Sequence, residues 1–169
     1  DDVITLGVEA FALCRYAGMC VARKITSDAA DSNAVIDLGK LRPNLFKLDP
    51  PTNVHVNRHD PALDREAALI KRRIPATRNF IKQNKINKVI FNPEKKTLGI
   101  IAVGKAATET IDAFDRIGIK TPENIGIGFF ACKIPWPLVD EEIIDFCDQF
   151  EEILVVEEKG GIVEEQVAH

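Results

Sequence analysis

The residues best suited to chemistry follow apolar segments in the second half of the chain. Lys105 comes directly after Gly104, and Glu157 and Glu158 follow the apolar run 153–156. A lysine at a helix start could hold a phosphate or carboxylate with the free amides of the first turn. Two glutamates could act as general acid and base, but adjacent strand residues point to opposite sides, so at most one faces a given cleft. The full phosphate-loop pattern is absent, and a lysine that packs, or pairs with Glu157 or Glu158, is the alternative interpretation.

Other reactive side chains lack the spacing of a known site. None of the four cysteines belongs to a Cys-x-x-Cys pair, which argues against a zinc ribbon or an iron–sulfur cluster and favours buried thiols in a reducing cytoplasm. His55 and His59 are interpreted as exposed loop residues, and Trp136, between two prolines, as a rigid hydrophobic plug of a core or interface. With no Gly-x-Ser-x-Gly or dinucleotide motif present, we assign no catalytic residue and no metal site.

The elements that must position these residues alternate between strand and helix. Strands are expected at 88–92, 98–103, 125–132 and 153–157, and helices at 105–117 and 140–150. This order predicts an α/β fold, a three-layer α/β/α sandwich with a mostly parallel sheet. In such sheets ligands gather at the carboxyl ends of the strands, so the loops that begin at residues 103, 132 and 157 should share one rim.

The first part of the chain has a different pattern. We expect a helix over 4–23, a short strand at 34–38 and a linker rich in proline and asparagine that includes Pro43. A helical stripe then runs from Leu63 through Ala67, Ile70, Ile74 and Thr77 to Ile81, with a kink or restart near Pro75. We therefore predict that 1–55 is the tail of a preceding domain plus a linker, and that 56–169 is one α/β domain.

Composition and charge narrow the class of protein. With 169 residues, 46% of them hydrophobic, the chain can bury a real core, and Glu9 and Arg15 interrupt its long apolar run, so we expect a globular chain without a membrane span. The net charge of -4 is uneven, because residues 65–88 are basic and residues 140–165 are acidic. A basic helix could contact nucleic acid, but it has few interleaved aromatics, which favours a solvated helix face. No targeting peptide is visible and the chain does not begin with Met, so we expect a fragment or a processed chain.

Several segments together resemble one family. LGIIAVGKA (98–106), KIPWPL (133–138) and ILVVEEKGGIVEEQ (153–166) resemble the transketolase carboxy-terminal-like domain of thiamine-dependent 2-oxoacid enzymes, and among these the indolepyruvate ferredoxin oxidoreductases. ALCRYAG (12–18) and ARK (22–24) resemble the end of the preceding pyrimidine-binding domain. Departures from the family pattern are Cys14 in place of serine, Ala17 in place of a second serine, and Cys20 in place of a frequent tryptophan.

The resemblance implies what the parent enzyme would do. That enzyme would oxidatively decarboxylate an aryl 2-oxoacid such as indolepyruvate on thiamine diphosphate with magnesium. It would pass electrons through iron–sulfur clusters to ferredoxin, with coenzyme A accepting the acyl group. Neither the Gly-Asp-Gly motif that holds the diphosphate nor a cysteine-rich cluster motif occurs here. We therefore expect no cofactor in this chain, which alone should be inactive, and expect partners among the other domains and subunits of a cytoplasmic homo-oligomer, but no nucleic acid or membrane.

Four residues are candidates for facing substrate or cofactor. Arg15 and Lys24 come from the family match, and Lys105 and Glu157 from the predicted rim. The main hypothesis is a non-catalytic structural and interface domain. One alternative is a free-standing interaction or regulatory domain whose acidic end binds a basic partner. Another is a small enzyme that uses Lys105 with Glu157 or Glu158.

Overall fold

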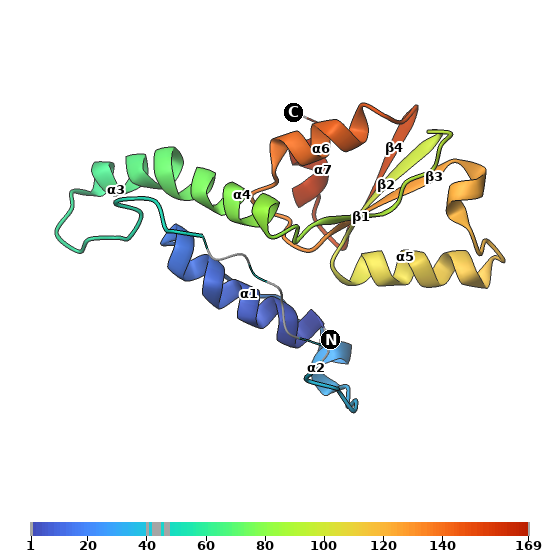
Figure 1. Cartoon of the computed structure of the whole chain (residues 1–169), viewed down its shortest axis with the longest axis horizontal. Coiled ribbons are helices and arrows are strands. Elements are labelled where there is room, and N and C mark those ends of the chain that lie inside the picture. The colour runs from blue at the N-terminus through green and yellow to red at the C-terminus, as the bar shows by residue number, and fades with distance from the viewer. Residues whose placement is uncertain (1, 40, 42–44, 46–47, 169) are drawn as a thin grey trace. The chain divides into compact units, whose positions relative to one another are not determined.

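The computed structural model of the chain describes residues 2–39, 41, 45 and 48–168, and they fall into two compact units (Figure 1). The first unit comprises Asp1–Asn84 and the second Lys85–His169. That residues 1–55 are the tail of a preceding domain plus a linker, and residues 56–169 one α/β domain, stays a prediction.

The N-terminal unit is helical. Helix α1 (Asp2–Ala17) packs against α4 (Ile74–Gln83), and the rings of Tyr16 and Phe80 lie 5.5 Å apart between centroids. The side-chain amide of Asn79 donates a hydrogen bond of 2.8 Å to the Tyr16 hydroxyl. The other helical segments of this unit are α2 (Ser27–Asp31), α3 (Ala62–Ala68) and the π-helical turn η1 (Leu69–Arg73).

Helix α1 ends earlier than the sequence predicted, and the reason lies at Gly18. This glycine has a positive φ of 64°, and its amide donates to the Cys14 carbonyl. A Cβ atom at this position would lie 2.4 Å from the Val54 carbonyl oxygen, so the backbone passes too close for a side chain. The helix predicted over 4–23 therefore stops at Ala17. The strand predicted at 34–38 was also wrong, since that segment has no strand pairing, whereas Pro43 of the predicted linker lies outside the described residues.

The restart predicted near Pro75 is confirmed. Proline has no amide hydrogen, and the helix accommodates it with one π-helical turn, in which the Ile74 amide bonds to the Leu69 carbonyl five residues earlier. Because the π-helical turn contains one more residue than an α-helical turn, the part of the predicted stripe before it and the part after it lie on different sides of the helix. Thr77 and Ile81 are buried, whereas Leu63 and Ile70 are 78% and 60% exposed.

The C-terminal unit is the α/β part of the chain. Its strands are β1 (Lys88–Phe91), β2 (Leu98–Val103), β3 (Ile127–Cys132) and β4 (Glu152–Val156), in the sheet order β1-β3-β2-β4. β2 runs parallel to both β3 and β4, and β1 is antiparallel to β3, so the mostly parallel sheet is confirmed. The connections are α5 (Lys105–Arg116), the 3-10 turn η2 (Pro122–Ile125) and α6 (Asp140–Cys147), and α7 (Ile162–Val167) follows β4.

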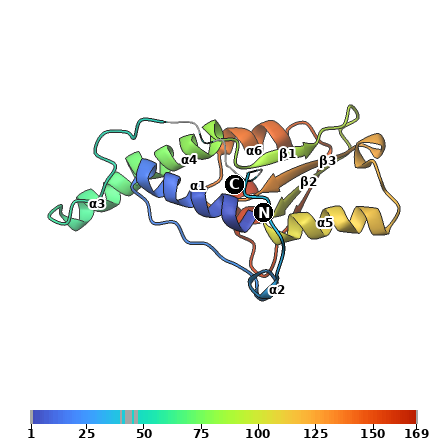
Figure 2. The same cartoon turned by 60° about the horizontal axis from the view of Figure 1, so that its bottom comes forward.

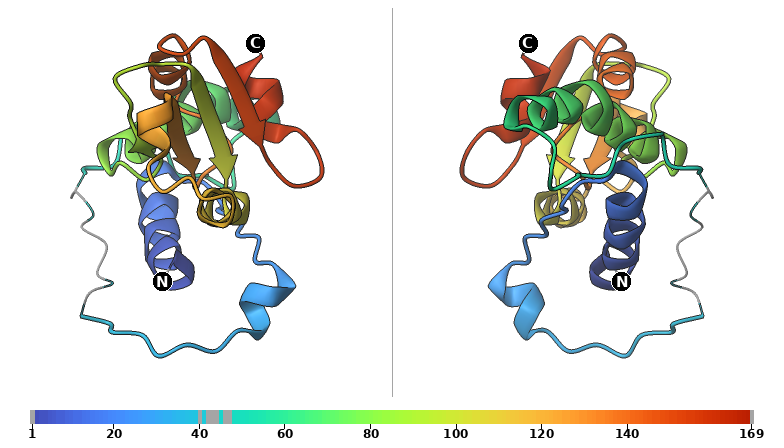
Figure 3. Two further views of the ribbon diagram at one scale, coloured as in Figure 1. Left: turned by 90° about the vertical axis from the view of Figure 1, so that its right-hand side faces the viewer. Right: turned by 90° about the vertical axis from the view of Figure 1, so that its left-hand side faces the viewer.

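Helices cover both faces of this sheet, with α5 on one side and α6 on the other (Figures 2 and 3). Successive side chains of a strand point to opposite faces, so β2 and β3 feed two separate cores. One core joins the strands to α6 and α7, and the other joins them to α5. The first contains Ile101, Phe130, Cys132, Leu138, Ile143, Phe146 and Val163, and the second Ile100, Ala102, Ala107, Phe114, Phe129 and Ala131.

A pair of glycines makes room for an aromatic ring that packs against the first core. Gly99 of β2 and Gly128 of β3 are register partners, and the ring of Phe150 lies directly over both. A Cβ atom on Gly128 would be 2.1 Å from the Phe150 ring, and one on Gly99 would be 2.9 Å from it. Only glycine fits beneath this ring.

Candidate functional site

The three parallel strands end side by side, which builds the predicted rim. Val103 of β2 is the register partner of Cys132, and Ala102 is the partner of Val156. The amide of Gly104, which has a φ of 55°, donates a hydrogen bond of 2.9 Å to the Cys132 carbonyl and ties the first two loops together. The prediction that these three loops lie at one edge of the sheet is therefore confirmed.

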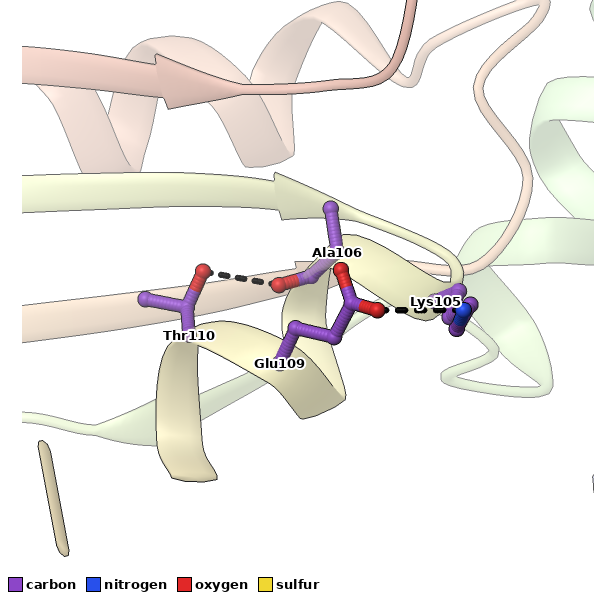
Figure 4. Close-up of polar contacts among 4 residues, drawn as sticks. All are labelled: Lys105, Ala106, Glu109 and Thr110. Atoms are coloured by element: carbon purple, nitrogen blue, oxygen red, sulfur yellow. Dashed lines mark hydrogen bonds and ion pairs between the residues drawn. The ribbon is translucent and has the colours of Figure 1, made fainter. Parts of the chain in front are cut away.

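Lys105 is the first residue of α5 and projects from the rim. Its ammonium lies 3.1 Å from a carboxylate oxygen of Glu109, one helical turn further on (Figure 4). Both side chains are largely solvated, at 38% and 56% exposure, so the pair contributes little to stability. In the next turn the hydroxyl of Thr110 donates to the Ala106 carbonyl at 2.7 Å. Lys105 thus has an intrahelical partner.

Glu157 lies at the end of β4 and caps the N-terminus of α7. One carboxylate oxygen accepts the amides of Ile162 and Val163 at 3.0 and 3.1 Å, and the other accepts the amide of Glu164 at 3.0 Å. These amides have no partner inside the helix, which is why a carboxylate is favourable there. Desolvation raises the pKa of this carboxyl, but the three amide hydrogen bonds outweigh it and the pKa is lowered. Glu157 is a charged structural cap, whereas Glu158 is exposed.

Two amide side chains hold the Pro-Trp-Pro loop that follows β3. Asn87 accepts the backbone amides of Lys133 and Ile134 at 2.9 and 3.0 Å. Gln166 of α7 accepts the Leu138 amide at 3.1 Å and donates to the carbonyls of Pro135 and Ile162, both at 2.8 Å. The loop contains a cis peptide bond between Trp136 and Pro137. The sequence did not predict that Asn87 and Gln166 hold this loop, because an isolated Asn or Gln gives no indication of a hydrogen-bond partner 28 or more residues away.

The ring of Trp136 is exposed and is not a core plug. It is 52% exposed, whereas the flanking Leu138 and Val139 are buried at 2% and 1%. The apolar anchor of the loop is therefore the pair that follows the second proline.

Cys132 is a potential nucleophile at the rim, and its surroundings suppress its reactivity. Burial, followed by the negative charges of Glu142 and Glu157, raises the pKa of its thiol to about 12. Its sulfur donates to the Ile134 carbonyl at 3.3 Å. Because the thiolate is the reactive form, this cysteine is inert near neutral pH.

The cysteines do not share one environment. Cys132 is buried and Cys147 half-buried, but Cys14 and Cys20 are exposed, so the expectation of four buried thiols holds for only part of the set. In the described part of the chain there is no group of three or more His, Cys, Asp or Glu side chains that could hold a metal ion.

The four candidate residues divide between the units. Lys105 and Glu157 both lie at the rim of the C-terminal sheet, whereas Arg15, in the last turn of α1, and Lys24, in the irregular segment after that helix, are exposed residues of the N-terminal unit. A substrate-facing or cofactor-facing role for any of them stays a prediction.

Taken alone, the fold and the rim define an α/β domain with a four-stranded, mostly parallel sheet and helices on both faces. Residues 88–169 match the family model described as "Indolepyruvate oxidoreductase domain". This match covers the four strands of the sheet and the described residues after it, so the C-terminal part of the chain is similar to the indolepyruvate oxidoreductase domain.

A comparison with solved structures adds one distant similarity. It is to the 2-oxoglutarate:ferredoxin oxidoreductase from Magnetococcus marinus, solved with 2-oxoglutarate, coenzyme A and succinyl-CoA bound. The identity is 16% and the TM-score 0.43, over 68% of this chain and 20% of that one. The chain thus spans about a fifth of the length of that relative. No curated protein matches. Among the described residues, no helix is both long and apolar enough to cross a membrane.

Proposed function

We propose that this chain is a non-catalytic structural and interface domain of an oxidoreductase that acts on an aryl 2-oxoacid of the indolepyruvate type, with ferredoxin as electron acceptor. The observation that carries the proposal is the state of the polar groups at the rim. The carboxylate of Glu157 accepts three backbone amides, and the side chains of Asn87 and Gln166 are hydrogen-bonded to the Pro-Trp-Pro loop. Burial keeps the thiol of Cys132 protonated. These groups maintain the domain and offer no arranged acid, base or nucleophile.

The donor set does not fit the cofactors that the family implies. Thiamine diphosphate needs a magnesium ion held by carboxylate or amide oxygens, and both oxygens of Glu157 already accept backbone amides. An iron–sulfur cluster needs several thiolates together, whereas burial keeps Cys132 protonated and Cys14 is exposed in the other unit. We therefore place these cofactors, and coenzyme A, on other parts of a parent enzyme.

The exposed apolar side chains of the C-terminal unit support an interface role. Trp136 is 52% exposed, Ile162 54% and Ile144 55%. Exposed tryptophan and aliphatic side chains are typical of surfaces that another domain or subunit covers. We infer that the parent is a cytoplasmic homo-oligomer and that this domain contributes to its assembly.

The proposal is tested by calorimetric titration of the chain with thiamine diphosphate and MgCl2. We expect no saturable heat, because the part of the chain that the structure describes has no group of three or more carboxylate, histidine or cysteine side chains placed to hold a metal ion. Tight binding with a stoichiometry near one would contradict a non-catalytic role.

A free-standing interaction or regulatory domain is the second candidate. It is favoured by the exposed acids at the C-terminal end, where Asp145, Asp148, Glu164 and Glu165 are all solvated. Such a surface could bind a basic partner. The size of the native polypeptide decides between the two: an antibody against this chain should detect one much longer protein in cell extract if the domain hypothesis is right.

A further inference from the structure

Arg73, at the end of the π-helical turn, is the least exposed charged residue that the structure describes. Its exposure is 9%, while its neighbours Lys71 and Arg72 are exposed. A guanidinium stays protonated at every accessible pH, so burial cannot neutralise it as it neutralises a buried lysine or carboxyl. A buried charge of this kind calls for a compensating anion.

The structure gives Arg73 very little compensation. One terminal nitrogen, Nη2, donates a hydrogen bond of 3.0 Å to the carbonyl of Arg65, which is a neutral acceptor. The Nε–H is buried and has no hydrogen-bond partner. Among the described residues, no carboxylate forms an ion pair with Arg73, and the surrounding segment carries more positive charge from Lys71, Arg72 and Arg78.

The π-helical turn is what puts Arg73 in this position. Ala68 and Arg73 are both buried and are five residues apart, which is the spacing of the π-helical hydrogen bond. Arg73 therefore lies on the same side as Thr77 and Phe80, whose side chains are 3% exposed. The hydroxyl of Thr77 donates to the Arg73 carbonyl at 2.9 Å, which holds the backbone at this point.

We infer that Arg73 anchors a binding site for a small oxyanion, a carboxylate or a phosphate. The planar guanidinium presents its Nε–H and an Nη–H in parallel, and two oxygens of one carboxylate or phosphate match that fork. The bound anion supplies the negative charge that the neutral carbonyl of Arg65 lacks. The exposed Lys71 and Arg72 raise the local concentration of anions near the site. Arg73, its hydrogen-bond partner Arg65 and the exposed Lys71 and Arg72 all belong to the N-terminal unit, and the inference does not depend on the function proposed for the C-terminal one.

Nuclear magnetic resonance on the whole chain provides the direct test. Inorganic phosphate and acetate are titrated separately, and each replaces chloride so that the ionic strength stays constant. We expect the Nε–H resonance of Arg73 to shift saturably with at least one probe, and the probe that acts identifies phosphate or carboxylate as the ligand. The resonances of exposed arginines such as Arg72 should shift weakly and without saturation. No saturable shift of the Arg73 signal with either probe overturns the inference.

Thermal unfolding provides a second readout. Tyr16, the single tyrosine of the chain, reports on the N-terminal unit. At ten times the Kd, the effective probe should raise the Tm of this unit by roughly 5 °C or more. The rise should vanish in Arg73→Met, diminish in Arg73→Lys and persist in the matched control Arg72→Met. An equal rise in Arg73→Met and wild type would show that the anion binds elsewhere. If Arg73→Met does not fold, the titration of the wild-type resonance still decides the question.

Discussion

Replacing Glu157 by glutamine removes a charge from the cap of α7 and leaves its size unchanged. The carboxylate accepts three backbone amides at 3.0 to 3.1 Å, two on one oxygen and one on the other. Glutamine keeps one acceptor oxygen and turns an NH2 group toward amides that are also donors. Losing a cap costs about 0.5 to 2 kcal/mol, and because solvent screens this carboxylate we expect about 1 kcal/mol. For a unit of this size that lowers Tm by roughly 4 to 8 °C.

The effect should depend on pH with a definite sign. The pKa of Glu157 is lowered in the folded state, so the carboxylate contributes stability that is fully present above the unfolded pKa of about 4.3. This contribution is lost as the pH falls through the folded-state pKa. The difference in unfolding free energy between wild type and Glu157→Gln should therefore be constant from about pH 5 upward and should shrink below it.

The single tryptophan makes the measurement specific to the right unit. Trp136 lies in the C-terminal unit, so its fluorescence during urea unfolding follows that unit. Glu158→Gln is the matched control, because it removes the same charge from an exposed neighbour. An equal loss of stability in Glu157→Gln and Glu158→Gln, or a difference between wild type and Glu157→Gln that does not change with pH, would refute the capping argument.

Two more predictions test the core and the rim. Gly128→Ala should lower the unfolding free energy of the C-terminal unit by about 1 to 3 kcal/mol in urea unfolding, because its Cβ would lie 2.1 Å from the Phe150 ring. Gly160→Ala, whose Cβ would meet nothing within 4 Å, should change it little, and equal effects of the two would contradict the packing argument. Cys132 should resist a thiol-specific disulfide reagent at pH 8 until the protein unfolds, because burial raises its pKa to about 12, whereas the exposed Cys14 should react at once in the same spectrophotometric assay. Rapid modification of Cys132 in the folded protein would show that its thiolate is accessible.

Much of the C-terminal fold could be predicted from local pattern. The near-continuous apolar runs 100–103 and 153–156 indicate strands covered on both faces, which holds for β2 but not for β4, whose residues are exposed or half-buried. The alternation of strands with helices indicates parallel pairing. Once the strands are parallel, their carboxyl ends must share one edge. The position of the rim could therefore be predicted from the sequence.

The state of the rim could not be predicted in the same way, because it depends on partners far apart in the chain. The local sequence around Glu157 is compatible both with a catalytic acid or base and with a helix cap. The difference arises only when α7 folds back and presents three amides to it. Its position between two prolines predicts Trp136 to be a rigid plug of a core or interface, but Asn87 and Gln166 fix the loop so that Leu138 enters the core and the indole does not.

Arg73 shows the physical origin of the remaining difference between pattern and structure. A period of 3.6 residues carried through Pro75 groups Leu63 and Ile70 with Thr77 and Ile81 on one face. Pro75 cannot donate an amide, and the helix responds with a turn that contains one extra residue, which rotates the residues before the turn by about 100° relative to those after it. Two large apolar side chains are thereby turned to solvent and the turn ends on a buried cation. The burial of Arg73, on which the proposed oxyanion site rests, is thus a consequence of Pro75 that a regular helical period does not predict.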